Sequence, residues 1–190
     1  MERIETERLV LRTFEETDLD MMHAYCVNPN VGSNAGWKPH ETLEDSKRIL
    51  KEFMEGDEVW AIEEKETGKV IGSCGLHRDH KRMNQRVRML GYVLDEPYWG
   101  RGYMTEVAKA LVAFGFTGMK LDLISVYHFS FNMRSKRVIE KCGFHYDGIM
   151  RQARLLYDGR VVDDVCYSLT KEEFFEKMRD KPYRLRPIGG

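Results

Sequence analysis

The residues best placed to do chemistry form the stretch Tyr98–Thr105, which reads Tyr-Trp-Gly-Arg-Gly-Tyr-Met-Thr. It lies between a strand-like run and an amphipathic helical pattern. Two glycines separated by one residue let the backbone approach a ligand and point consecutive N–H groups outwards. These amides adjoin the free donors and positive dipole end of the helix, where anions bind, and Thr105 adds a hydroxyl. The stretch therefore predicts a pyrophosphate cradle that needs no lysine.

Two common phosphate-binding motifs do not fit this stretch. A Walker A loop requires Gly-Lys-Ser/Thr four residues beyond its first glycine, and that sequence is absent. A dinucleotide fingerprint requires a third glycine three positions after Gly102, where Thr105 stands. A Gly-x-Gly pair alone is also compatible with a plain tight turn, so the surrounding sequence has to decide.

The composition is typical of a soluble globular chain. Of the 190 residues, 42% are hydrophobic and 32% are charged, and this length suits one domain with a full core. The longest apolar run, around Val107–Phe116, is broken by Lys109 and is too short to span a bilayer. The N-terminal residues do not resemble a signal peptide. We therefore expect a cytoplasmic protein without a membrane partner.

Charge and cysteine content argue against two further kinds of site. The chain has 30 basic and 31 acidic residues, so no global charge attracts nucleic acid. Its cysteines lie far apart and form no CxxC pair, which argues against structural zinc and fits a reducing compartment. We expect neither a metal nor a nucleic-acid partner. The cysteines are Cys26, Cys74, Cys142 and Cys166.

Hydrophobic periodicity predicts the elements that position the turn. They form one mixed α/β domain over residues 1–182, with a loose tail over residues 183–190. Asn28-Pro29-Asn30 is interpreted as the end of the first helix. Gly143 is expected to end the late helix in a left-handed conformation. The main expected strands are 59–64, 70–76, 86–94, 121–127, 144–157 and 160–169, and the main later helices are 104–116, 133–142 and 171–177.

Separated segments of the chain resemble one known family. Gly91–Leu94 with Pro97–Glu106 resembles the acyl-CoA-binding motif of the GNAT superfamily of N-acetyltransferases, and more narrowly that of its RimJ/RimL branch. Thr6–Arg12 resembles the opening strand of that branch, and Asp163–Thr170 resembles its closing strand. Asn132–Phe144 resembles its Asn-x-x-Ser…Glu-Lys-x-Gly-Phe helix. The segments occur in the order of the family.

The resemblance implies a strongly twisted mixed sheet of about seven strands, flanked by about four helices and splayed between strands 4 and 5. The fourth strand maps to residues 86–94. Arg101 is expected either to balance a phosphate charge or to be a solvated loop cation. The backbone expected to meet the pantetheine arm of acetyl-CoA is that of Tyr92, Val93 and Leu94. The residues expected around its pyrophosphate are Trp99, Gly100, Arg101, Gly102, Tyr103, Met104 and Thr105.

Helix 133–142 carries two polar candidates. Ser135 shares a face with Val138, Ile139 and Cys142, so its hydroxyl points inwards and needs a partner. The resemblance implies that Ser135 lies near the sulfur of acetyl-CoA and helps to protonate the departing thiolate. The alternative is a local bond to a carbonyl one turn back or to Asn132. Asn132 is expected either to bind the CoA or to cap the helix.

Two proton-handling groups of the family are missing. The amine must lose a proton and the departing thiolate must gain one. The glutamate expected two residues before Gly91 is Met89 here, and the tyrosine expected in the late helix is Ile139. The general base is therefore unassigned, unless the amine arrives neutral. A backbone N–H near Val93 is the expected oxyanion donor. The remaining candidate bases are Asp163, Asp164, His128 and Tyr127.

The acceptor pocket is expected between the early helices, the loop 28–40 and the final hairpin. Tyr25, Trp37, His40 and Arg154 are its candidate lining residues. Trp37 either closes over the ligand or anchors its loop to the core. The sequence does not choose between a protein N-terminus and a small-molecule amine. Dimerisation through the sheet edge or the final hairpin is compatible with it, although no pattern establishes a dimer.

The sequence favours an N-acetyltransferase that uses acetyl-CoA as co-substrate, with two alternatives. A non-catalytic acyl-CoA-binding regulator or sensor would explain Met89 and Ile139. An RNA- or ribosome-associated adaptor would explain the basic run His77–Arg88. That run lacks interleaved aromatic residues, so a solvated hairpin explains it better.

Overall fold

A computed structural model describes residues 1–180 of the chain. Its strands form one sheet in the order β1-β2-β3-β4-β5-β6-β8-β7, and every neighbouring pair is antiparallel except β5 and β6. The strands are β1 (Ile4–Glu5), β2 (Leu9–Arg12), β3 (Val59–Glu64), β4 (Val70–Arg78), β5 (Val87–Leu94), β6 (Leu123–Phe129), β7 (His145–Leu155) and β8 (Val161–Thr170).

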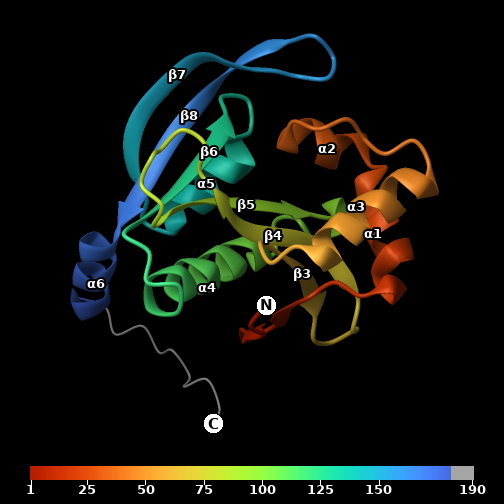
Figure 1. The fold of residues 1–190 in the computed structure, drawn as a ribbon, viewed down its shortest axis with the longest axis horizontal. Helices are drawn as coiled ribbons and strands as arrows, with labels where there is room; N and C mark the ends of the chain where they lie inside the picture. The colour runs from red at the N-terminus through yellow and green to blue at the C-terminus, as the bar shows by residue number, and fades with distance from the viewer. Residues whose placement is uncertain (181–190) are drawn as a thin grey trace.

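Helices cover both faces of this sheet (Figure 1). The α-helices within the described residues are α1 (Leu19–Cys26), α2 (Pro29–Ala35), α3 (Leu43–Glu55), α4 (Tyr103–Thr117), α5 (Met133–Lys141) and α6 (Lys171–Asp180). Short 3-10 helices lie at Glu16–Asp18 and Glu96–Tyr98. None of the helices within residues 1–180 combines the length and the apolar character needed to cross a membrane.

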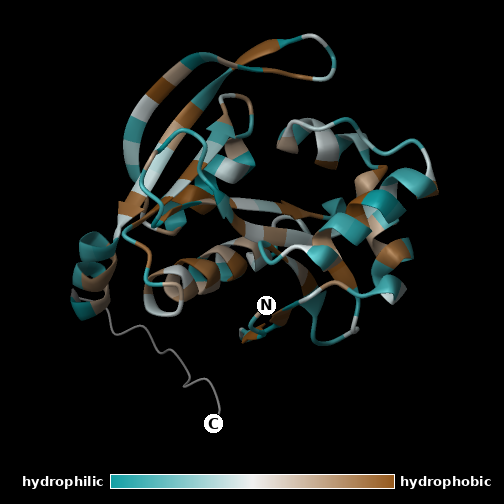
Figure 2. Cartoon of the chain, in the orientation of Figure 1, coloured by the Kyte–Doolittle hydropathy of each residue, from teal (hydrophilic) through white to brown (hydrophobic). Residues whose placement is uncertain are grey.

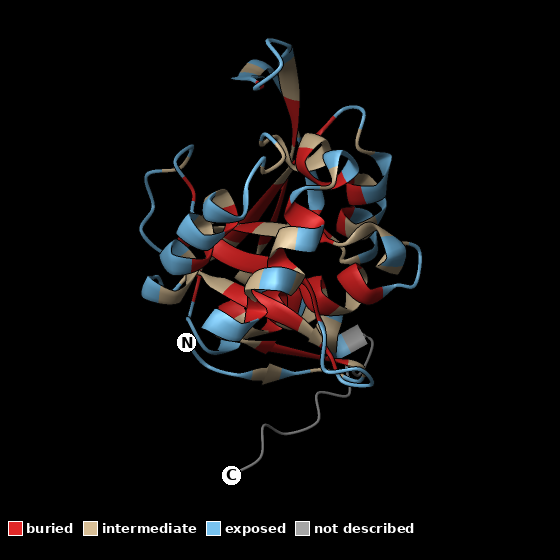
Figure 3. Cartoon of the chain, turned by 90° about the vertical axis from the view of Figure 1, so that its right-hand side faces the viewer, coloured by how far each residue is buried: buried red, intermediate tan, exposed pale blue. Residues whose placement is uncertain are grey.

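The sheet separates two hydrophobic cores. The larger core joins α4, Ile139 of α5 and Phe174 of α6 to one face, and the smaller core joins α1 and α3 to the other. Figure 2 accordingly shows apolar residues along α4 and the central strands, while in the outer hairpin they alternate with hydrophilic ones. Figure 3 shows the buried residues concentrated in the centre. Strand β7 contains no buried residue, so the outer hairpin projects from the body of the domain.

The sheet opens between β5 and β6. Their parallel pairing covers only Val87–Met89 of β5 against Leu123–Ser125 of β6. Beyond Met89, β5 continues to Leu94 while paired on its other side with β4. The splay expected between the fourth and fifth strands is therefore confirmed, and the numbering differs only because the two-residue strand β1 precedes the expected ones.

The first helix stops where the sequence predicted, since α1 ends at Cys26, just before Asn28–Pro29. The further helix α2, which begins at this pair, was not expected from the sequence. The side chain of Asn28 accepts a hydrogen bond from the Asn30 amide at 2.9 Å, and Pro29 occupies the first helical position, where its missing N–H costs nothing. The chain therefore has more helices than the four expected. The prediction of a loose tail over residues 183–190 lies outside the described residues.

A buried ion pair holds α1 against the sheet. Asp18 is 1% exposed and accepts two hydrogen bonds from the guanidinium of Arg12, at 2.8 and 2.9 Å. It also accepts one from the Glu15 amide, while Arg12 reaches Glu63 on β3. Strand β2 and the start of α1 are thereby fixed to each other.

We predict that Asp18→Ala lowers the free energy of unfolding by about 3 kcal/mol, because it leaves a nearly buried guanidinium with only one carboxylate partner. Urea denaturation measures this loss. Glu55→Ala is the control, since Glu55 belongs to an exposed pair with Lys51 and should cost about 0.5 kcal/mol or less. Equal losses in the two variants would contradict the role assigned to Asp18.

Candidate functional site: a cleft at the open edge of the sheet

A cavity of about 770 Å³ lies at the splay. It runs from the N-terminus of α4, past the part of β5 that β6 does not cover, to the helices α1 to α3. The residues expected from the sequence to bind the cofactor, protonate the thiolate or line the acceptor pocket all border this cavity except Arg101, and the candidate base Asp163 also lies outside it. The structure therefore brings together segments that are far apart in the chain. They are Tyr25, Trp37, Tyr92, Val93, Leu94, Trp99, Gly100, Gly102, Tyr103, Met104, Thr105, Asn132, Ser135 and Arg154.

The turn before α4 has the geometry of an anion site. Gly100 and Gly102 adopt left-handed conformations, with φ of 79° and 82°, which other residues rarely tolerate. The first helical hydrogen bond runs from the Glu106 amide to the Gly102 carbonyl at 3.1 Å. Within the described residues, no acceptor is recorded for the amides of residues 100–105. These amides are the free donors of a helix N-terminus, which favours a phosphate.

Contacts behind the turn hold it in place. Glu106 accepts hydrogen bonds from the hydroxyl of Thr6 at 2.6 Å and from the amide and Nε of Arg8, both at 2.8 Å. Arg8 also donates to the carbonyl of Arg101 at 3.0 Å. Burial alone would raise the pKa of Glu106, but these bonds keep it below its ordinary value. The segment between β1 and β2 thus supports the anion site.

The positive charges of the site come from α5 more than from the turn. Arg101 lies outside the cavity lining, with its guanidinium 5.3 Å from the ring centre of Tyr98. Instead, Arg134, Arg137 and Lys141 line the cavity. Their spacing places them on one side of the helix, a signal that the sequence contained and that we did not use.

The hydroxyls of Ser135 and Tyr92 form a pair at the open edge of β5. Their oxygens lie 2.8 Å apart, and Ser135 is 9% exposed. Burial raises the pKa of Tyr92 well above its ordinary value, so its phenol stays protonated. Ser135 therefore has a partner on the neighbouring strand and not the local one considered above. Ile139, where the family tyrosine was expected, packs in the core.

Asn132 is the N-cap of α5. Its side-chain oxygen accepts a hydrogen bond from the Ser135 amide at 3.1 Å, and its side-chain nitrogen donates to the Asn34 carbonyl at 3.0 Å. The residue thereby fixes the start of α5 to α2. Both contacts are compatible with its place in the cavity lining, and CoA binding by Asn132 stays a prediction.

Aromatic side chains dominate the other end of the cavity. Tyr25 of α1 is 1% exposed, and its hydroxyl has no hydrogen-bond partner among the described residues. Trp37 packs beside His40, with ring centres 5.6 Å apart, and lies close to Gly32 of α2. Gly36, at the end of α2, packs against the ring of Phe129 on β6. The short helix α2 thus crosses from one side of the splay to the other.

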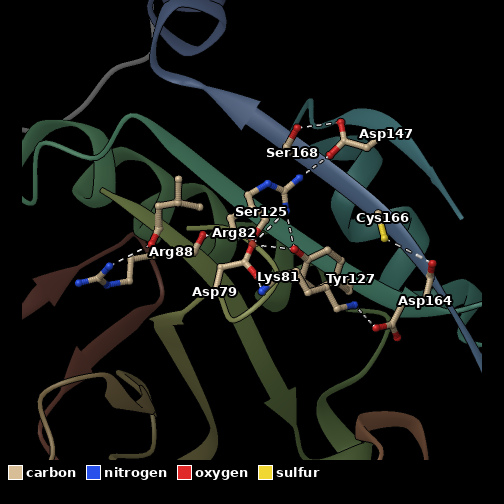
Figure 4. Close-up of polar contacts among 11 residues, drawn as sticks. Asp79, Lys81, Arg82, Arg88, Ser125, Tyr127, Asp147, Asp164, Cys166 and Ser168 are labelled. Atoms are coloured by element: carbon tan, nitrogen blue, oxygen red, sulfur yellow. Dashed lines mark hydrogen bonds and ion pairs between the residues drawn. The ribbon is translucent and has the colours of Figure 1, made fainter. Parts of the chain in front are cut away.

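A buried carboxylate, Asp79, fixes the loop after β4 to β6. It accepts hydrogen bonds from Ser125 at 2.7 Å, Tyr127 at 2.6 Å and Arg82 at 3.0 Å (Figure 4). Burial alone would raise the pKa of Asp79, but these bonds hold it below its ordinary value. The hydroxyl of Tyr127 donates its hydrogen bond to Asp79, and burial raises the pKa of this tyrosine well above its ordinary value.

A second buried carboxylate, Asp164 of β8, contacts the same loop. It is 1% exposed and forms ion pairs with Lys81 and with Arg154, the latter at 3.1 Å. Arg154 therefore lines the acceptor end of the cavity while its Nε is held by Asp164. The ion pair between Arg154 and Asp164 therefore adds little net charge to the acceptor end.

Three of the four expected bases are engaged or away from the cavity, and the fourth, His128, is buried in the cavity wall. Tyr127 and Asp164 have the partners just described. Asp163 accepts a hydrogen bond from the Gln152 amide at 2.7 Å and does not line the cavity. His128 bonds the Phe129 carbonyl through Nδ1, and its Nε2 is buried without a partner among the described residues.

Thiolate or metal chemistry would require a reactive thiol or a group of metal ligands among residues 1–180. Burial raises the pKa of Cys142 to about 12 and that of Cys26 to about 12, so both are inert thiols. Cys142 packs against the larger core as expected. Residues 1–180 contain no group of three His, Cys, Asp or Glu side chains arranged to hold a metal ion.

Residues 8–145 match the family described as the acetyltransferase (GNAT) domain. The chain belongs to this family. GNAT acetyltransferases use acetyl-CoA as co-substrate, which accounts for an anion site joined to a long cleft. The chain is thus an N-acetyltransferase by family, and the expected enzyme class is confirmed.

Similar proteins cover almost the whole chain. The uncharacterized N-acetyltransferase p20 of Bacillus licheniformis is 30% identical over 179 residues, or 92% of this chain and 99% of p20. The uncharacterized N-acetyltransferase YoaA of Bacillus subtilis is 29% identical over 176 residues, or 88% of this chain and 96% of YoaA. The crystal structure of a GNAT acetyltransferase from Bacillus anthracis is 26% identical with a TM-score of 0.83, covering 90% of this chain and 100% of that one.

Two further GNAT structures share the fold alone. The ribosomal-protein-S5-alanine acetyltransferase from Vibrio fischeri is 20% identical with a TM-score of 0.75, covering 91% of this chain and 98% of that one. The spermidine N-acetyltransferase from Vibrio cholerae, solved with CoA and spermine, is 19% identical with a TM-score of 0.74, covering 88% and 98%. Their names give two different acceptors, so the fold does not select the acceptor.

We predict that Gly100→Ala weakens CoA binding by about tenfold, because a left-handed alanine costs about 1–2 kcal/mol and the turn relaxes away from its anion-binding form. Calorimetry with CoA measures the affinity. Gly68→Ala is the matched control: Gly68 is also left-handed with open space around it, but it lies in the β3–β4 turn. The same CoA affinity in both variants would contradict an anion site at Gly100.

Proposed function

We propose that the protein is a RimJ/RimL-like N-acetyltransferase that moves the acetyl group of acetyl-CoA directly to a primary amine. The observation that carries the proposal is the continuity of one cavity from the amides before α4, through the splay, to an aromatic end beneath α2. The helix Asn132–Phe144 and the closing strand Asp163–Thr170 support the narrower branch.

The cleft offers a place for each part of acetyl-CoA. The pyrophosphate would accept hydrogen bonds from the amides of residues 100–105, with Arg134, Arg137 and Lys141 beside it. The pantetheine arm would pair with the β5 backbone at residues 92–94, which no strand covers on the β6 side. A backbone N–H near Val93 would then receive the developing oxyanion.

The hydroxyl pair supplies a proton donor for the leaving group. The amine nitrogen forms a bond to the thioester carbon, the carbon–sulfur bond breaks, and the sulfur takes a proton. Ser135 Oγ would give that proton, and the Tyr92 hydroxyl at 2.8 Å would replace it. Tyr92 thus joins the site through its side chain, where the sequence had suggested only its backbone.

The acceptor end favours an amine with an apolar or aromatic neighbour. Its described lining includes Tyr25, Trp37 and Phe129, and its one carboxylate, Asp164, is already paired with two cations. A polyamine would need several free carboxylates to balance its charges. We propose a monoamine, either a protein N-terminal amine or a small molecule with one amino group.

Acetyl-CoA binding followed by thiol release tests the function. The panel contains N-terminal peptides with different first residues, monoamines with apolar or aromatic groups, and spermidine. The proposal expects CoA binding by calorimetry and turnover of peptides or monoamines above spermidine. CoA binding without thiol release on any amine would favour a non-catalytic acyl-CoA sensor, and spermidine as the best acceptor would overturn the acceptor class.

We predict that Ser135→Ala lowers kcat by about 10²-fold, because the departing thiolate loses its proton donor. The affinity for CoA should stay within twofold, since the hydroxyl makes no contact with the anion site. Steady-state thiol release and calorimetry separate the two quantities. Ser33→Ala, which changes an exposed hydroxyl on α2, is the control and should leave kcat unchanged. A normal kcat in Ser135→Ala would remove the serine from the mechanism.

A further inference from the structure

The proposed reaction needs a group that removes a proton from the acceptor ammonium. Met89 cannot do so, and Tyr127, Asp163 and Asp164 are engaged or lie away from the cavity. His128 alternates along β6 with the acceptor-facing residues and points, like Ile124 and Val126, to the side of the larger core. One titratable side chain on the acceptor face of the sheet has not yet been given a role. It is His77, which the sequence had presented only as part of a basic hairpin.

His77 lines the cavity on the face that belongs to the acceptor. Along β4, Cys74 and Leu76 point into the larger core with α4, so His77 points to the opposite face. Its partner across the ladder is Met89 on β5. Both residues border the same cavity as Val93 and the aromatic residues of α1 and α3. The imidazole therefore lies on the side from which the amine must approach.

Two glycines make room for the imidazole beside β5. Gly75 and Gly91 face each other across the β4–β5 ladder. A Cβ atom built on Gly91 would lie 2.9 Å from His77 Cδ2, and one built on Gly75 would lie 2.8 Å from His77 Nε2. Any side chain at either position would displace the ring. The ring thus rests over Gly91, directly before the β5 segment at which the thioester is proposed to lie.

Glu58 places a carboxylate beside one nitrogen of this ring. Its carboxylate lies 3.4 Å from His77 Nδ1, and the side chain of His77 is 33% exposed. Nδ1 is the nitrogen on the side of the carboxylate, so a proton on Nδ1 leaves the lone pair on Nε2, which lies close to both glycines. Met89 and Gly91, which face the ring from β5, carry no charge. The arrangement is that of a base held by an orienting carboxylate.

We propose that His77 is the general base of the acetyl transfer and that Glu58 is its positioning residue. His77 Nε2 takes a proton from the acceptor ammonium, and the neutral amine attacks the thioester carbon. The carbon–sulfur bond breaks and the thiolate takes the proton of Ser135. The extra proton that the nitrogen loses as the amide forms restores the Ser135–Tyr92 pair, and His77 returns its proton to solvent. This inference rests on the proposed function.

The test compares two acceptors in His77→Gln. With an alkylamine, which is protonated at neutral pH, loss of the base should lower kcat/KM by about 10²-fold. With a weakly basic amine that the wild type also turns over, and that is neutral at the assay pH, the loss should be threefold or less. A structural defect would lower both rates equally, so the difference between acceptors reports the proton transfer.

Two further variants test the positioning residue and provide a control. Glu58→Gln should show the same dependence on the acceptor with a smaller loss of about tenfold, and an unchanged KM for acetyl-CoA. His80→Gln, which changes an exposed histidine three residues away, should behave as wild type. Calorimetry with CoA shows that each variant retains the folded cofactor site.

The outcomes separate the two proposals. An active wild type with an equal loss for both acceptors, or with no loss in His77→Gln, would overturn the role of His77 and leave the acetyltransferase intact. A wild type that releases no thiol with any amine would overturn the proposed function, and the role of His77 with it. If His77→Gln failed to bind CoA, Glu58→Gln alone would decide through its dependence on the acceptor.

Discussion

The short parallel pairing between β5 and β6 is the constraint on which the site depends. After three residue pairs, β6 diverges and β5 continues with one edge uncovered. An uncovered edge inside a protein is costly unless something satisfies its N–H and C=O groups. An extended cofactor arm can satisfy these groups. The splay of the sheet therefore supplies hydrogen-bonding groups whose pairing contributes to ligand binding.

Other contacts keep that opening from closing. The carboxylates of Asp79 and Asp164 hold the loop after β4 against β6 and β8 through buried hydrogen bonds and ion pairs. The short helix α2 adds a brace from the opposite side, since Asn34 contacts Asn132 and Gly36 packs on Phe129. Buried charges are expensive, and here each carboxylate is offset by two or more hydrogen bonds or ion pairs.

Local sequence signals predicted the parts of the site that depend on the backbone. The two glycines before α4 require left-handed conformations, and such a requirement can be seen in the residues themselves. The fold class and the splay followed from the resemblance. The cap at Asn28 was missed because proline is both a helix breaker and a good first residue. His77 and the Ser135–Tyr92 pair were missed because each depends on the register between distant segments, whereas the cations of α5 could have been found from their helical spacing.

Side chains on the two faces of strand β5 belong to different cores. Leu90, Tyr92 and Leu94 face the core built by α4 and α5, whereas Val93 faces the one built by α1 and α3. Side chains that serve the cofactor and side chains that serve the acceptor therefore alternate along a single strand. Substitutions at the acceptor-facing positions of β5 can consequently accumulate with little disturbance of the cofactor-facing positions. A lineage with this fold can change its substrates while its use of the acetyl donor stays constant.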